Sequence, residues 1–223
     1  MRQLKRHNDR DWFREHKSEY QRWVEEPMKG LVLAVAAECR KRALPLHAKE
    51  KNPLFRIYRD IRFSKDKRPF KTHVAAELRR SFEGSGPMLY LHLSPEESFV
   101  AAGMWQPERN VLHAWRETIA SEPARFQKIL RALDKAGLAL NKEYSLSATP
   151  RGFQNYANEP FAQWLKLTSF VLSRPLDQAE CTRPDVLSTV VDFAIVVKPL
   201  LQFGWYIEEN HLSDKRSANS FLD

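Results

Sequence analysis

The amino-acid sequence predicts an α+β fold in which helices flank a mostly antiparallel sheet and a long helix lies near the C-terminus. Three observations predict it: segments with a two-residue apolar period gather in the first half of the chain, segments with a helical period flank them, and no regular βαβ alternation occurs. The 223 residues contain neither a repeat nor a linker, so we expect one domain over residues 1–223.

Two helices are expected before the first strand. Asn8 or Asp9 can cap a first helix, and Pro27 restarts the chain before a second amphipathic helix over residues 28–42. Because both helices carry one apolar stripe, we expect them to pack against each other as a pair.

The sheet is expected to begin after these helices. The apolar period changes to two over residues 55–63, which predicts a strand, and a polar turn leads to a second strand over residues 72–78. Residues 88–93 and 98–104 predict two further strands, and the four polar residues between them suit an antiparallel hairpin.

The second half of the chain is predicted to be mainly helical. Prolines open helices over about residues 107–120, 123–136 and 184–206, and Pro199 is expected to kink the last of them. Residues 165–172 are rich in β-forming side chains and predict one more strand, closed by Arg174 and Pro175. A short helix over residues 160–166 competes for the start of that strand.

Composition and charge limit the partners and the compartment. The formal net charge of +8 and the isoelectric point near 9.5 favour acidic partners such as nucleic acid, phosphorylated metabolites or an anionic membrane surface. Cys39 and Cys181 are far apart and lack a CxxC motif, which argues against a disulfide framework. The chain has no signal-peptide pattern and no stretch near the ~18 uninterrupted apolar residues of a membrane span. We therefore expect a cytoplasmic protein that does not associate with membranes.

The segment over residues 55–73 carries the densest positive charge. In a strand, Arg56, Asp60 and Arg62 would project to one face, where Asp60 would orient the two guanidinium groups for an anion. Arg59 would fall on the apolar face, where it needs a carboxylate or a ligand as partner. A surface ion-pair ladder accounts for the same pattern without any ligand.

The candidate site residues follow from this segment. Asp60 and His73 are candidate proton-transfer groups. The candidate ligand-binding residues are Arg56, Tyr58, Arg59, Arg62, Lys65, Lys67, Lys71, Thr72, His92, Arg151 and Arg174. The sequence assigns no cofactor and does not decide whether the protein is an enzyme.

Several familiar motifs are absent. The loop after the predicted strand lacks the glycines of a P-loop, and no GxGxxG or GxSxG motif occurs, since Gly84 and Gly86 belong to a polar turn. His73, His92 and Glu77 can approach one another across neighbouring strands, but no HExxH or HxH spacing is present. We therefore expect no metal site.

Six sequence strings follow one another in the order NDRDWF, LFRIYRDIRFSKDKRPFKTH, YLHL, ESFVAAGMW, PRGF and LTSFVLSRPL. Together they resemble the bacterial and fungal domain-of-unknown-function family 2461, over about residues 4–206. That family has no established activity, so the resemblance implies no catalytic residues, cofactor or substrate.

Three functions are therefore compatible with the sequence. The first is binding of a phosphorylated or carboxylated small molecule at the basic sheet face, with or without catalysis. The second is a nucleic-acid-binding module in which Tyr58 or Trp105 stacks on a base. The third is an interaction domain without chemistry, which would present a flat apolar patch.

Overall fold

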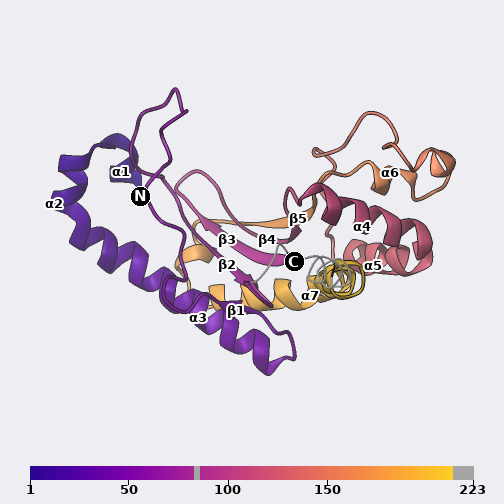
Figure 1. Cartoon of the computed structure of the whole chain (residues 1–223). Helices are drawn as coiled ribbons and strands as arrows, with labels where there is room; N and C mark the ends of the chain where they lie inside the picture. Colours follow the sequence, from indigo (N-terminus) through magenta and orange to yellow (C-terminus); the bar gives the residue numbers. More distant parts are fainter. Residues whose placement is uncertain (83–85, 213–223) are drawn as a thin grey trace, which may run out of the picture. The chain divides into compact units, whose positions relative to one another are not determined.

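A computed structural model describes residues 1–82 and 86–212, and it confirms the α+β fold (Figure 1). A five-stranded antiparallel sheet has the order β1-β2-β3-β4-β5. Its strands are β1 (His47–Ala48), β2 (Val74–Arg79), β3 (Met88–Leu93), β4 (Ser98–Met104) and β5 (Phe170–Leu176). The strands predicted over residues 72–78, 88–93 and 98–104 correspond to β2, β3 and β4.

Helical elements precede and follow the central strands. They are α1 (Arg2–Arg6), α2 (Arg10–Tyr20), η1 (Gln21–Glu25), α3 (Glu26–Lys41), α4 (Arg109–Ser121), α5 (Pro123–Lys135), η2 (Gln154–Tyr156), α6 (Ala162–Leu165), η3 (Glu180–Thr182), α7 (Val186–Ile207) and η4 (Glu208–Leu212). The helices predicted near residues 107–120, 123–136 and 184–206 are confirmed as α4, α5 and α7. The turn at Gly84 and the end of the chain from residue 213 lie outside the described residues.

The chain forms two compact units. The first unit contains residues 1–80, 89–100 and 174–195, and the second contains residues 81–88, 101–173 and those from 196 onward. The expectation of one domain over the whole chain stays a prediction.

In the first unit, α2, η1 and α3 form one uninterrupted helical run (Figure 1). Asp9 begins the run, because its side chain accepts a hydrogen bond of 2.8 Å from the backbone N–H of Trp12. Pro27 occupies the first turn of α3 just after a π-helical turn, where a proline needs no backbone donor. The prediction of two paired helices is therefore wrong, since proline here continues the helix.

The strand predicted over residues 55–63 is also wrong. This segment makes only two isolated bridges, between Leu54 and Ala76 and between Tyr58 and Phe70. Three residues lie between Leu54 and Tyr58, whereas five lie between their partners Phe70 and Ala76. The returning chain therefore carries two extra residues, and such a bulge interrupts the hydrogen-bond ladder that a regular strand needs.

The core of the first unit lies under α3. The side chains of Val32, Val35 and Cys39 are completely buried on the face of α3 that packs against β1 and β2. The register of these two strands pairs His47 with Arg79 and Ala48 with Leu78. A satellite cluster, formed by Leu4, Phe13 and Phe70, joins α1 and α2 to the chain that follows residue 58.

The second unit has an aromatic core. Trp115 of α4 stacks on Phe170 of β5 with ring centroids 4.4 Å apart, and Phe126 and Phe203 pack beside them. Arg116 is also buried. Its guanidinium donates to the backbone carbonyls of Leu165, the last residue of α6, and of Leu167. Each buried N–H of this kind needs such an acceptor.

Strand β5 begins and ends later than the sequence predicts. The predicted strand over residues 165–172 starts with the helix α6, which confirms the competing short helix. Arg174 and Pro175 do not close the strand but lie inside it. Because β5 is the last strand in the sheet order, one of its sides has no neighbouring strand, and proline is tolerated at such an edge.

Helix α7 and the turn after it are unusually apolar. By length and composition, Val186–Asn210 is the one helix among residues 1–82 and 86–212 that could cross a membrane. The core helix of a soluble protein meets the same criterion, and Val190, Ala194 and Leu200 are completely buried here. This apolar helix is therefore weak evidence for a membrane span. Pro199 lies within the helix, as the sequence predicts.

Candidate functional site

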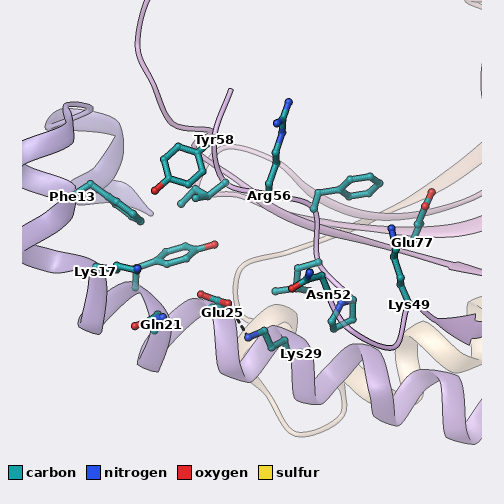
Figure 2. Close-up of a pocket in the computed structure, with 15 residues that line it drawn as sticks. Phe13, Lys17, Gln21, Glu25, Lys29, Lys49, Asn52, Arg56, Tyr58 and Glu77 are labelled. Carbon is teal, nitrogen blue, oxygen red and sulfur yellow. Dashed lines mark ion pairs between the residues drawn. The ribbon is translucent and has the colours of Figure 1, made fainter. Parts of the chain in front are cut away.

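A hollow of about 650 Å³ lies in the first unit, between the α2–η1–α3 run and residues 49–58 (Figure 2). We call it the cationic pocket. Phe13 and Tyr58 lie at one end of it, and Lys49 and Glu77 lie at the other, as Figure 2 shows. Polar side chains from the helical run face the extended segment across the hollow.

The helical wall is built from residues at four-residue spacing. Lys17, Gln21, Glu25 and Lys29 line the pocket, and this spacing places them on one face of a helix. Lys29 Nζ lies 2.8 Å from a carboxylate oxygen of Glu25 and 2.9 Å from one of Glu26. These bonds raise the pKa of Lys29, and they use the one carboxylate that this wall presents to the pocket.

Tyr20 adds a hydroxyl group to the same wall. Burial and the nearby Glu25 carboxylate raise the pKa of Tyr20 to about 12. The phenol is therefore protonated at neutral pH and can donate a hydrogen bond into the pocket.

The opposite wall is held by the edge of the sheet. The backbone N–H of Phe55 donates to the carbonyl of Ala75 at 2.9 Å, next to the bridge between Leu54 and Ala76. This pairing holds the segment beside β2, where Asn52, Arg56 and Tyr58 line the pocket. The strand that the sequence predicts here is absent, and two isolated bridges take its place.

Three cationic side chains that line the pocket are free of the ion pairs that hold Lys29. Within the described part of the chain, Lys17, Lys49 and Arg56 form neither an ion pair nor a side-chain hydrogen bond. The two carboxylates that line the pocket form ion pairs with other residues, because Glu25 binds Lys29 and Glu77 lies 3.0 Å from Arg79. The pocket therefore carries a local excess of positive charge.

Lys71 extends this positive region beyond the pocket. Burial lowers the pKa of Lys71, and the neighbouring positive charge of Arg56 lowers it further. The Lys71 ammonium lies 5.7 Å from the ring centroid of Phe55. Arg56 extends from its segment on the side away from the helix (Figure 2), which is consistent with this neighbour.

Two imidazoles and two aromatic rings form a cluster on β3, on β4 and on the residue that precedes β2. The ring centroids of His73 and His92 are 4.3 Å apart, and His92 stacks on Phe99 at 4.9 Å. The Tyr90 hydroxyl lies 3.3 Å from His92 Nδ1. Burial, together with the charges of His92 and Lys71, lowers the pKa of His73 to about 4, so the imidazole is neutral at neutral pH.

The predicted approach of the two histidines is thus observed, without a third ligand. Glu77 turns to Arg79, and the described residues contain no group of three or more histidine, cysteine, aspartate or glutamate side chains that could hold a metal ion.

Two arginines of the predicted site, Arg59 and Arg62, are paired within their own loop. Arg59 Nη1 lies 2.6 Å from an Asp66 oxygen, and Arg68 binds the same carboxylate at 2.7 Å. Arg62 binds both oxygens of Asp60, at 3.0 Å and 2.7 Å. These contacts lower the pKa of both carboxyl groups, and that of Asp66 most strongly. The requirement of Arg59 for a carboxylate is met by Asp66 and not by a ligand.

Other candidates are dispersed. Thr72 is half-buried in the bulged stretch, and Lys65 and Lys67 are exposed. Arg174 of the first unit lies 2.9 Å from Glu180. Arg151 is exposed in a turn of the second unit. None of these residues lines the cationic pocket.

The sequence interpretation missed the helical wall. Lys17, Gln21, Glu25 and Lys29 repeat every four residues, and this polar stripe is a signal that the sequence contains. Lys49 and Asn52 carry no comparable signal, because only the pairing of the next residues with β2 brings them to the same hollow.

Comparison with known proteins places the chain in a family. No curated protein and no solved structure matches the chain significantly. The model of one family, described as conserved hypothetical protein (DUF2461), matches residues 1–203, which confirms the resemblance seen in the sequence strings. The chain therefore belongs to the DUF2461 family of conserved hypothetical proteins.

Proposed function

We propose that the protein binds a small anionic ligand, bearing a phosphate or a carboxylate group, in the cationic pocket of its first unit. The observation that carries the proposal is that Lys17, Lys49 and Arg56 line one hollow and form no ion pair or side-chain hydrogen bond within the described residues. Cations that line a hollow without an ion pair make its electrostatic potential favourable for an anion.

The size and chemistry of the pocket support a metabolite-sized ligand. A volume of about 650 Å³ falls in the range of roughly 300–1,000 Å³ that is typical of small-molecule sites. The Tyr20 hydroxyl and the Asn52 amide add neutral hydrogen-bonding groups. Phe55 and Tyr58, with exposed fractions of 41% and 53%, offer aromatic surface for an apolar part of the ligand.

The proposal concerns binding and not a reaction. Asp60 is held by Arg62 on both of its oxygens, so it is poorly suited to accept a proton from a substrate. His73 is neutral and can accept a proton, but it lies outside the residues that line the pocket. We therefore assign no catalytic residue.

Calorimetric titration tests the proposal, after a thermal-shift screen with inorganic phosphate, pyrophosphate, sugar phosphates, mononucleotides and dicarboxylates. We expect at least one ligand to bind, and Lys17→Gln or Lys49→Gln to weaken its affinity about tenfold or more, because a hydrogen bond to a charged group contributes about 1.5–3 kcal/mol.

The matched control is Lys51→Gln. Lys51 lies two residues from Lys49 and is exposed, but it does not line the pocket. This variant makes the same change in net charge and should bind the ligand as the wild type does. Equal losses in Lys49→Gln and Lys51→Gln would show that only the general positive field attracts the ligand. Absence of binding by every ligand in the screen would refute the proposal.

A further inference from the structure

The chain over residues 58–70 folds into an ordered projecting hairpin, which we call the basic hairpin. In Figure 1 it is the purple loop that extends past α1. Its base is closed by the bridge between Tyr58 and Phe70 and by a hydrogen bond of 2.9 Å from the N–H of Arg59 to the carbonyl of Pro69. Closer to the tip, Lys67 Nζ donates to the carbonyl of Ile61 at 3.0 Å. The tip is therefore held in place by internal contacts.

The acidic residues of the basic hairpin serve this internal structure. Asp66 binds Arg59 and Arg68, and Asp60 binds Arg62. The hairpin contains five cationic side chains and only these two carboxylates, so an excess of positive charge remains. Lys65, which is exposed at the tip, forms no ion pair or hydrogen bond with another described residue.

Phe63 stands at this tip with 95% of its surface exposed. Its flanking residues are Arg62 and Ser64, and the Arg62 guanidinium lies 5.8 Å from the centroid of the ring. A phenylalanine side chain so fully in water forgoes the stabilisation that burial would supply. A ring presented beside cations, on a loop that internal contacts hold in place, suits a partner that offers both a flat apolar face and negative charge.

At the tip, a single exposed ring favours a nucleobase over a lipid bilayer. Loops that insert into a bilayer bury apolar area in proportion to their affinity, so they gather several apolar residues. Here Phe63 is surrounded by Arg62, Ser64 and Lys65, and the neighbouring Ile61 is partly covered. Stacking on one base, with lysine or arginine contacts to the adjacent phosphates, requires only one ring and a few cations.

We propose that the basic hairpin binds single-stranded nucleic acid, with Phe63 stacked on a base and with Lys65 and Lys67 against the phosphates. Trp105, the other aromatic residue considered for stacking from the sequence, belongs to the second unit, where its ring meets Tyr144 edge-on at 4.6 Å. The hairpin tip shares no residue with the cationic pocket, so this inference is independent of the proposed small-ligand binding.

Fluorescence anisotropy with labelled twelve-nucleotide oligo(dT) and oligo(U) tests the inference at about 50 and 200 mM salt. We expect Phe63→Ala to weaken binding about 5- to 100-fold at both salt concentrations, whereas Phe63→Trp retains it, because stacking needs a ring and not phenylalanine itself. The double variant Lys65→Gln with Lys67→Gln should reduce the slope of log affinity against log salt by about 1.4, since each lost phosphate contact contributes about 0.7 for a single strand. The two oligonucleotides distinguish DNA from RNA as the preferred strand.

The matched control for the ring is Trp23→Ala. Trp23 is 68% exposed, and the Arg22 guanidinium lies 4.7 Å from its ring centroid, but it projects from a helical turn and not from the hairpin. This variant should bind as the wild type does. Three results would overturn the inference: no oligonucleotide binding at about 50 mM salt, equal affinity of Phe63→Ala and wild type, or Phe63-dependent binding to phosphatidylserine vesicles without binding to oligonucleotides.

Discussion

Asn8 joins the basic hairpin to the N-terminal helices through two hydrogen bonds, and replacing it tests how much this connection stabilises the fold. Asn8 Nδ2 donates to the carbonyl of Phe70 at 3.0 Å, and Asn8 Oδ1 accepts from the N–H of Phe70 at 3.0 Å. Phe70 is 2% exposed, and its ring lies 4.3 Å from that of Phe13. One amide thus satisfies both backbone groups of a buried residue.

Asn8→Ala should therefore lower the free energy of unfolding by about 2–4 kcal/mol. Each backbone group of Phe70 loses its partner, and an unsatisfied buried group costs about 1–3 kcal/mol. Two such groups would together cost about 2–6 kcal/mol. Because the two hydrogen bonds are only partly buried, water can replace part of the lost bonding, so we expect the lower half of that range. For a chain of this size, the midpoint temperature should fall by about 5–15 °C.

Urea denaturation followed by circular dichroism measures this change as a shift in midpoint at constant m value. Asn8→Asp keeps an acceptor for the N–H of Phe70 and removes the donor, so it should lose about half as much. The control is Asn141→Ala, because Asn141 accepts only one exposed local bond, from the N–H of Glu143 at 2.8 Å. A loss below about 1 kcal/mol in Asn8→Ala, or a loss equal to that of the control, would refute the assigned role.

Three further outcomes are expected. The pKa of His73 is about 4 in the folded protein and about 6.5 in the unfolded chain, so the unfolded chain takes up the proton first as the pH falls. The contribution of His73 to stability is complete above about pH 6.5, and the free energy of unfolding should fall by about 1–3 kcal/mol toward about pH 4. Urea titrations should show a smaller fall in His73→Gln. Gly103→Ala should lower the free energy of unfolding by about 3 kcal/mol or more in the same assay, because φ at Gly103 is +121° and a Cβ would lie 2.0 Å from the carbonyl oxygen of Phe170. A loss below about 1 kcal/mol would contradict this geometry. Native alkylation followed by mass spectrometry should modify the half-buried Cys181 before Cys39, whose burial raises its thiol pKa to about 11, and the reverse order would contradict the assigned burial.

Local signals determined much of the fold. Asp9 stands before an amphipathic stretch, and Pro123 begins another, so both helix starts follow from capping and proline chemistry. Strands β3 and β4 follow from short apolar segments that turn residues separate. These elements are predictable because the residues that decide them lie within a few positions of one another.

Pairing over longer distances decided what the sequence could not. The alternating pattern after residue 54 lacks a regular strand because its partner chain carries two extra residues, and a bulge is a property of the pair and not of either segment. Some of the charges of the same segment are paired locally, and these pairs can be predicted from the sequence. Asp60 and Asp66 neutralise Arg62 and Arg68 from two residues away, which the sequence itself contains.

Tertiary structure alone assigned the remaining charges to a site. Lys17 and Arg56 are separated by 39 positions, and they line one pocket only because the segment of Arg56 pairs with β2 while α3, which continues from α2, packs on the same strand. Composition determined that the protein is basic. The packing of distant segments decides which cations line one pocket without an ion pair, because electrostatic interactions act through space and not along the chain.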